Sequence, residues 1–395
     1  MEANYYAGQR LPLLRDRDAG ETSVSSTELF FDLVYVFAVT QLSHMLLDNL
    51  TWRGALNTAI MTLAVWWVWI DTAWITNWFD PLKLPIKFML FALMLLGLIM
   101  SAAIPEAFDG RGLIFALAFV GAQLGRTGFC VLTLGSNAQA TNFKRIFSWY
   151  AFSAVFWLAG GFADGDTRLN LWIVAVTIDC ISPAIGFWTP GLGRSDTREW
   201  TISGEHLAER CQLFVIICLG ESLLLTGSTL ASSDDIATAN FAAFLTAFVL
   251  SVSMWWVYFA RAGRSQELIR DSDDPGRYGR VFTYFHMPMV AGIITLAAGN
   301  ELVIAHPTGH IEPATTVVVI AGAAIYIVGN ALFNATLIES LPWRRLSALG
   351  ALGVLAAIAH LMSPLAVLVG VAAVFIGIAI ADYSGTTEVE PVISG

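Results

Sequence analysis

Two carboxylates, Glu28 and Asp32, open the first long apolar stretch of the sequence. Residues four apart in a helix share a face, so both acids point the same way. A charge inside a membrane costs about 2.5 to 3.5 kcal/mol in insertion experiments, and such residues usually face a bundle interior. The spacing therefore predicts an acid pair that handles an ion or a proton. A structural alternative stays open, in which Ser26 or Thr27 caps the helix and Glu28 favours its positive end.

A second apolar stretch also carries charged residues, namely Glu209 and Arg210 near its start and Glu221 after Gly220. Arg210 and Glu221 are eleven residues apart, which is about 16 Å along a helix. They cannot pair with each other, so each needs a partner on another helix or in a cavity. Gly220 favours a loosened turn whose carbonyl groups can hold an ion. The candidates for ion or proton handling are Glu28, Asp32, Glu209 and Glu221.

Further charged residues lie inside other apolar stretches, with Arg126 and Asp179 expected at similar depth. Breaking a buried pair of arginine and carboxylate costs about 3 to 5 kcal/mol, so pairing is the least costly arrangement for them. We predict that these two residues pair, and a purely structural role for the pair remains an alternative. Arg126 or Arg210 would supply the countercharge to the acids. Secondary candidates for proton handling are Asp71, His44 and His286.

Apolar stretches of membrane-spanning length must position these side chains. Of the 395 residues, 56% are hydrophobic and 13% are charged, a composition that excludes a soluble domain of this size. A helix of about 20 residues crosses the hydrocarbon core, and the sequence offers about 12 such stretches. We therefore predict an all-α fold, a polytopic membrane helix bundle. The expected spans are 28–47, 55–78, 86–104, 112–135, 146–163, 169–189, 207–230, 237–260, 281–305, 314–338, 345–362 and 364–382.

Basic residues are distributed unevenly over the expected loops. Of the 21, 16 fall in the amino-terminal tail or in loops on its side, whereas Arg53, Arg111 and Arg168 fall opposite. Because cytoplasmic loops retain Lys and Arg, this split predicts that both termini lie in the cytoplasm. Residues 1–25 are polar and contain no cleavable signal peptide, so we expect the first helix to act as its own signal.

The two halves of the sequence look duplicated. Trp66-Trp67-Val68-Trp69 in the second expected helix corresponds to Trp255-Trp256-Val257-Tyr258 in the eighth. Six helices per half is an even number, so the repeat would be parallel, with the first and seventh helices lining a central interface. The predicted organisation is a cytoplasmic tail at 1–25, six-helix repeats at 26–190 and 205–383, and a disordered acidic tail at 384–395.

The stretch from Glu28 to His44, with Glu209-Arg210 and Gly220-Glu221-Ser222, resembles the bacterial low temperature requirement protein A family. The resemblance covers nearly the whole chain, including the Trp-Trp element in each half. It implies a multi-pass protein of the bacterial cytoplasmic (inner) membrane that is associated with growth in the cold, and it implies no particular biochemical activity.

The leading functional hypothesis is a secondary transporter or ion-conducting protein in which Asp32 and Glu221 handle the ion or proton. Two alternatives stay open: a membrane-embedded enzyme acting on a lipid-linked substrate, and a sensor or assembly partner that responds to membrane state. The enzyme is less favoured, because no catalytic signature is visible; nor is a phosphate-binding loop or a metal cluster. We expect no metal and no cofactor. The expected partners are the lipid bilayer and an unknown ion or small-molecule substrate, without nucleic acid, and the sequence leaves an oligomer open.

Overall fold

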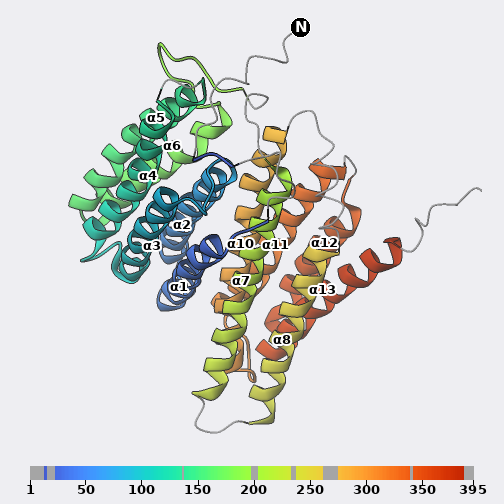
Figure 1. Cartoon of the computed structure of the whole chain (residues 1–395). Coiled ribbons are helices and arrows are strands. Elements are labelled where there is room, and N and C mark those ends of the chain that lie inside the picture. Colours follow the sequence, from blue (N-terminus) through green and yellow to red (C-terminus); the bar gives the residue numbers. More distant parts are fainter. Residues whose placement is uncertain are drawn as a thin grey trace, which may run out of the picture. The chain divides into compact units, whose positions relative to one another are not determined.

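Helices make up the regular structure of the described residues, beside two isolated β-bridges. The computed structural model describes residues 13–15, 23–135, 138–196, 203–232, 237–260, 275–338 and 341–386. The predicted all-α fold is confirmed. The α-helices, labelled in Figure 1, are α1 (Ser26–Asp48), α2 (Trp52–Trp78), α3 (Leu84–Ala103), α4 (Gly112–Leu134), α5 (Ala138–Phe162), α6 (Gly165–Ala184), α7 (Gly204–Ala231), α8 (Thr238–Phe259), α10 (Pro275–Ala305), α11 (Pro313–Ile338), α12 (Trp343–Ile358) and α13 (Pro364–Thr386).

Ten of the described helices are long and apolar enough to cross a membrane, which agrees with the predicted membrane bundle. The other two are α5 and α6. The first turns of α5 contain Lys144 and Arg145, and α6 carries Arg168 and Asp179. These charges lower the hydropathy of both helices, although each has the length of a membrane span.

The described residues divide into two compact units, and each is treated by itself below. The first unit is drawn from residues 1–41, 56–210 and 273–279, and the second from 42–55, 211–272 and 280–395. Most of α1 and the first turns of α7 therefore belong to the first unit. The internal repeat of six helices stays a prediction.

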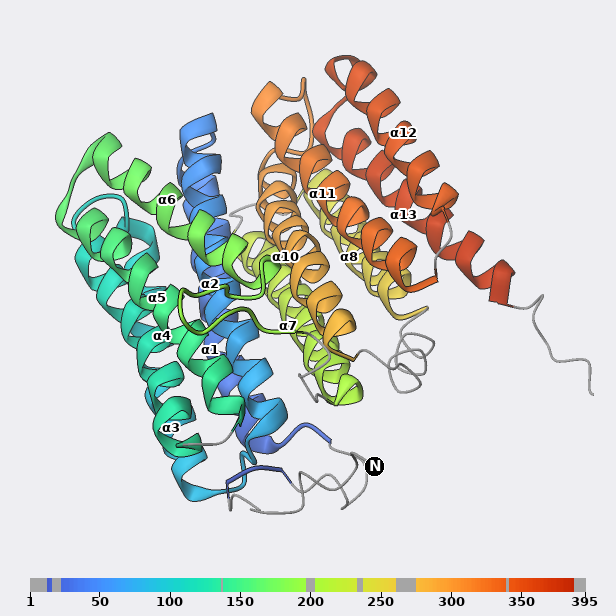
Figure 2. The ribbon, with the colours of Figure 1, turned by 90° about the horizontal axis from the view of Figure 1, so that it is seen from above.

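In the first unit, α3, α4, α5 and α6 pack side by side in chain order (Figure 2). Aromatic rings fill the space between α4, α5 and α6, with the ring centroids of Phe119 and Trp157 4.5 Å apart and those of Trp157 and Trp172 5.5 Å apart. Gly160 permits this packing, because a Cβ atom there would lie 2.4 Å from Cδ1 of Trp172. The result is an aromatic core between these helices, and its Trp157 also donates to Asp179, one of the polar residues described below.

In the second unit, α10 and α11 approach each other closely through glycines. A Cβ atom at Gly292 would lie 2.6 Å from the backbone nitrogen of Tyr326, and one at Gly329 would lie 2.9 Å from that of Met289. Small residues at helix interfaces let backbones approach in this way within membranes. The hydroxyl of Tyr326 then donates to the carbonyl of Met254 on α8 at 2.9 Å, which ties a third helix to the pair.

Candidate functional site

The amino-terminal end of α1 is closed by a capping box that includes Glu28. The backbone N–H of Ser25 and its hydroxyl each donate to Glu28 Oε2 at 2.8 Å, and the N–H of Glu28 donates to Ser25 Oγ at 3.3 Å. This reciprocal arrangement satisfies two backbone donors of the first turn. The cap is therefore Ser25, and the expectation of Ser26 or Thr27 is wrong, because the helix already begins at Ser26, one residue too early for a Ser26 cap and two too early for a Thr27 cap.

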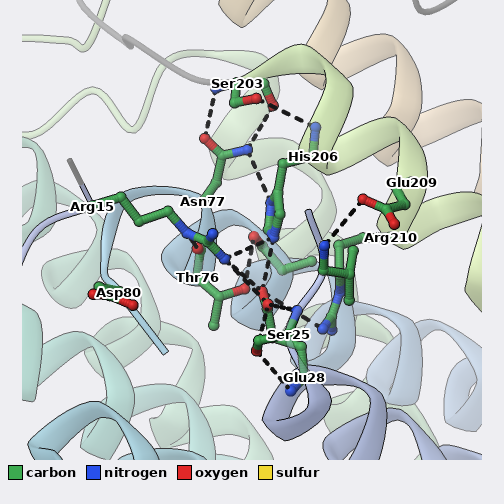
Figure 3. Close-up of polar contacts among 12 residues, drawn as sticks. Arg15, Ser25, Glu28, Thr76, Asn77, Asp80, Ser203, His206, Glu209 and Arg210 are labelled. Atoms are coloured by element: carbon green, nitrogen blue, oxygen red, sulfur yellow. Dashed lines mark hydrogen bonds and ion pairs between the residues drawn. The ribbon is translucent and has the colours of Figure 1, made fainter. Parts of the chain in front are cut away.

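Arg15 reaches the same carboxylate from the segment that precedes α1. Its Nη2 lies 3.2 Å and 3.1 Å from the two oxygens of Glu28, and its Nε donates to the carbonyl of Thr76 at 2.7 Å. A β-bridge between Leu14 and Phe79 aligns this segment with the end of α2. Figure 3 shows Arg15 and Glu28 converging from these two directions. A residue of the segment before the helix, 13 positions from Glu28, thus supplies its countercharge.

His206, at the start of α7, contacts Glu28 from a third direction. Its Nε2 lies 2.9 Å from Glu28 Oε1, and its Nδ1 lies 3.3 Å from Asn77 Nδ2. The backbone of Ser203 orients the Asn77 amide, since Asn77 accepts the Ser203 N–H at 2.8 Å and donates to the Ser203 carbonyl at 2.7 Å (Figure 3). The NH2 group of Asn77 therefore faces Nδ1, which accepts. The Asn77 contact at Nδ1 favours the neutral tautomer with hydrogen on Nε2, which then donates to Glu28. Arg15 Nη2 lies 3.0 Å from the same Nε2, so the guanidinium and the imidazole meet at this carboxylate.

Asp32, one turn further along α1, pairs with Arg210 of α7. Arg210 Nη2 and Trp69 Nε1 both donate to Asp32 Oδ1, each at 2.8 Å. Arg210 Nη1 lies 3.8 Å from Glu28 Oε1, so one guanidinium stands between two carboxylates. The guanidinium also lies over the rings of Phe31 and Trp69, at 6.0 Å and 5.7 Å from their centroids. Asp32 and Arg210 are completely buried.

Part of the hydrogen-bonding capacity of this buried pair is unused. Oδ2 of Asp32 and the Nε and Nη1 atoms of Arg210 have no hydrogen-bond partner among the described residues. Buried polar groups are nearly always bonded, so exceptions in a native structure need an explanation. We call Arg15, Glu28, Asp32, His206 and Arg210 the first charge cluster. With neutral His206, its two arginines balance its two carboxylates.

A second charge cluster, made of Asp71, Gln123, Arg126 and Tyr150, joins α2, α4 and α5. Arg126 Nη2 lies 3.0 Å from Asp71 Oδ2, and its Nη1 donates to the carbonyl of Val68 at 2.9 Å. Gln123 Nε2 donates to Asp71 Oδ2 at 3.2 Å, and the hydroxyl of Tyr150 also donates to that oxygen. Asp71 was expected only as a secondary candidate, yet it is the partner of Arg126.

The predicted pair of Arg126 and Asp179 is therefore wrong. Asp179 on α6 accepts from Trp157 Nε1 at 2.9 Å through Oδ2, and its Oδ1 has no hydrogen-bond partner among the described residues. Similar depth in the sequence does not determine which helix faces which. Arg126 points from α4 to α2, where Asp71 and the carbonyl of Val68 receive it.

The acids of α7 do not share one environment. Glu209 is half-buried, and its Oε2 accepts the backbone N–H of Val24 at 3.1 Å, just before α1. Glu221 is buried on the part of α7 that belongs to the second unit. The ion-handling roles predicted for Glu28, Asp32, Glu209 and Glu221 stay predictions.

The two histidines named as secondary candidates both belong to the second unit. His286 is buried, with Nε2 2.7 Å from the hydroxyl of Tyr258 and Nδ1 3.1 Å from the carbonyl of Phe282. The carbonyl requires hydrogen on Nδ1, so Nε2 accepts from the tyrosine. His44 lies half-buried on the last turns of α1. No group of three or more His, Cys, Asp or Glu that could hold a metal was found within the described ranges.

Several members of the two clusters, and one donor to them, were not recognised from the sequence. The members are Arg15, Gln123, Tyr150 and His206, and the donor is Trp69, which bonds Asp32. The pattern Ser25-x-x-Glu28 is a capping-box signature and could have identified the cap. Arg15 lies in a polar tail and Trp69 in a run of tryptophans, so neither carries a local signal for its partner.

Comparisons with known proteins give the family of this chain. The chain is 39% identical to an uncharacterized protein of Rhizobium meliloti (strain 1021) over 299 residues, which cover 74% of this chain and 73% of that protein. No solved structure matches it. The family model described as bacterial low temperature requirement A protein matches residues 23–380, a range that contains all of both charge clusters except Arg15. The chain therefore belongs to the bacterial low temperature requirement A protein family.

Proposed function

We propose that this multi-span membrane protein is a secondary transporter or ion-conducting protein that uses carboxylates inside its helices. The observation that carries the proposal is the position of Arg210 between two buried carboxylates. It bonds Asp32 at 2.8 Å and lies 3.8 Å from Glu28. A guanidinium with free donors and two acceptors within reach can change its partner by a small movement.

The partner exchange would follow the charge on Asp32. Arg210 Nη2 bonds Asp32 Oδ1 at 2.8 Å, the arrangement expected when Asp32 is ionised. When a proton or a cation neutralises Asp32, the attraction to Arg210 falls and the guanidinium moves toward Glu28 Oε1. Arg210 lies on α7 and both acids lie on α1, so this exchange would shift the two helices against each other. A conformational change tied to ion occupancy is what coupled transport requires.

The remaining contacts of Glu28 give it a fixed role in this scheme. The capping box, Arg15 and His206 hold the carboxylate from three sides. Glu28 would therefore stay ionised and act as the stationary acceptor, while Asp32 gains and loses the ion. The roles of the two acids differ because, of the two, Asp32 alone has a buried oxygen to which no described residue is hydrogen-bonded.

Flux measurements in proteoliposomes test the proposal. Proton and monovalent-cation flux is measured across a pH range for the native chain, Asp32→Asn and Glu221→Gln. Asp109→Asn is a matched control, because Asp109 is an exposed carboxylate of the same unit. We expect native flux that is lost in Asp32→Asn and kept in Asp109→Asn, while Glu221→Gln tests the acid of the second unit.

Absence of flux under every imposed gradient, with folded native protein in the vesicles, would contradict the proposal. The two alternative functions, an enzyme for lipid-linked substrates and a sensor of membrane state, would then be favoured over transport. Equal flux in the native chain and Asp32→Asn would instead remove Asp32 from the mechanism. The proposed orientation, with both termini in the bacterial cytoplasm, is tested separately by labelling of single cysteines placed in the loops.

A further inference from the structure

The region around the second charge cluster contains one more acid than base. Asp71 is paired with Arg126 at 3.0 Å, which balances those two charges. Asp179 lies close enough to interact electrostatically with Asp71 and Tyr150. Among the described residues it forms no ion pair, and Arg126 is already occupied. With every acid ionised, this region would carry one uncompensated negative charge.

Asp179 is also buried, with 1% of its surface exposed. Its Oδ2 accepts from Trp157 Nε1 at 2.9 Å, and Oδ1 has no hydrogen-bond partner among the described residues. An isolated ionised carboxylate in such surroundings is so costly that the group usually neutralises instead. The hydroxyl of Ser153 lies near this carboxyl group but carries no charge, so a neutralising partner is still needed, and Oδ1 is the oxygen left to receive it.

We propose that Asp179 binds a proton at Oδ1 and is a proton-binding site inside the first unit. The inference rests on the proposed function in one respect, namely that this proton is the one exchanged during transport. The proposed mechanism would then involve two acids: Asp32, where Arg210 exchanges partners, and Asp179, which no described arginine neutralises.

The surroundings favour a proton over a sodium ion. Sodium sites in transporters are built from several oxygens, including unwound backbone carbonyls. Asp179 lies on α6 four residues before Pro183, which has no N–H to offer the Asp179 carbonyl, and the hydroxyl of Ser182 donates to that carbonyl instead at 3.2 Å. The indole N–H of Trp157 donates to Oδ2 and would repel a cation, and the neighbouring Ser153 hydroxyl can donate as well. A proton needs only the one free oxygen. Its neutral carboxyl group also keeps the indole hydrogen bond on Oδ2.

Infrared spectroscopy of the full chain in lipid tests the site directly. A protonated carboxyl group gives a carbonyl-stretch band that is separate from the carboxylate bands and shifts in D2O. We expect such a band at neutral pH in the native chain, its loss in Asp179→Asn and its persistence in Asp32→Asn. Asp179→Glu, which keeps a carboxyl group, should retain a band at a changed frequency and covers the case in which Asp179→Asn does not fold.

Two results would overturn the inference. The first is a carbonyl-stretch band that is unchanged in Asp179→Asn. The second is the disappearance of this band from the native chain when sodium is added at constant pH, because that result would show a cation site instead. Flux is measured on the same samples. If the native chain has the Asp179 band but no proton flux, the transport proposal fails while the proton site stands. If proton flux persists unchanged in Asp179→Asn, the site is not part of transport.

Discussion

Two buried ion pairs of arginine and aspartate, Arg210 with Asp32 in the first unit and Arg345 with Asp382 in the second, are built differently. In the second unit, Arg345 Nη1 and Nη2 bind the two oxygens of Asp382 at 2.7 Å and 2.5 Å, and its Nε donates to Asn330 Oδ1 at 3.0 Å. In the first unit, Arg210 binds Asp32 through one oxygen only, at 2.8 Å. Both pairs are buried, so burial alone does not distinguish them.

The difference separates a pair that locks helices from one that can change. The two-point contact of Arg345 uses the geometry in which guanidinium and carboxylate bind most strongly. Arg344 Nη1 adds a contact to Asp382 Oδ1 at 3.2 Å. Arg210 instead has two nitrogens from which no described residue accepts a hydrogen bond, and a second carboxylate 3.8 Å away. The four predictions below test this comparison.

The largest loss of stability is expected from Asp382→Ala. The substitution leaves Arg345 buried without its countercharge, which costs about 3 to 5 kcal/mol in comparable buried pairs. Unfolding of the purified protein in detergent measures the change in the free energy of unfolding. The double variant Arg345→Met with Asp382→Leu should recover most of the loss. Equal losses in the single and double variants would show that the pair is not the cause.

Asp32→Asn should cost less, about 1 to 3 kcal/mol, although it also removes the partner of a buried arginine. The reason is that Arg210 has Glu28 within reach, whereas no second carboxylate contacts Arg345 in the described residues. Unfolding of the two variants under identical conditions measures the difference. Combining Asp32→Asn with Glu28→Gln should cost more than the sum of the single changes, by about 0.5 to 3 kcal/mol. Strict additivity would mean that Arg210 does not exchange partners.

Ser25→Ala should destabilise the protein by about 1 kcal/mol, the usual effect of removing a helix cap. Ser26→Ala is the matched control, because Ser26 is exposed and its neighbour Ser25 makes the capping contacts. Unfolding measurements compare the two variants. A larger loss of unfolding free energy in Ser26→Ala than in Ser25→Ala would show that Ser26 is the cap, as the sequence suggested.

The smallest effect is expected at Arg344, whose side chain is 40% exposed. Exposed ion pairs typically contribute about 0.2 to 1 kcal/mol and weaken with salt. Arg344→Gln should therefore change the free energy of unfolding slightly at low salt and hardly at all at high salt. A loss as large as that of Asp382→Ala would mean that Arg344, and not Arg345, neutralises the carboxylate.

The helices could be predicted from the sequence because their cause is local. An apolar run long enough to cross a membrane must satisfy its backbone groups internally, and a helix does so with its own residues. The expected spans near Asp32, Arg126 and Asp179 all became helices for this reason. The shared face of Glu28 and Asp32 also follows from helical periodicity alone, and both acids are completely buried.

The partners of the buried charges could not be predicted, because pairing depends on how helices rotate and pack. Sequence depth suggested Asp179 for Arg126, but Arg126 turns to α2 and binds Asp71. Arg15 carries no helix signal, yet it is held beside Glu28 through a backbone bridge to the end of α2.

The sequence by itself thus determined that this chain forms apolar helices and that acids lie inside them, since length, composition and periodicity act within one segment. Only the tertiary structure decided that Asp382 is neutralised from two points, Asp32 from one and Asp179 by no described side chain. The physical reason is that the energy of a buried charge depends on its neighbours in space, and those come from other helices.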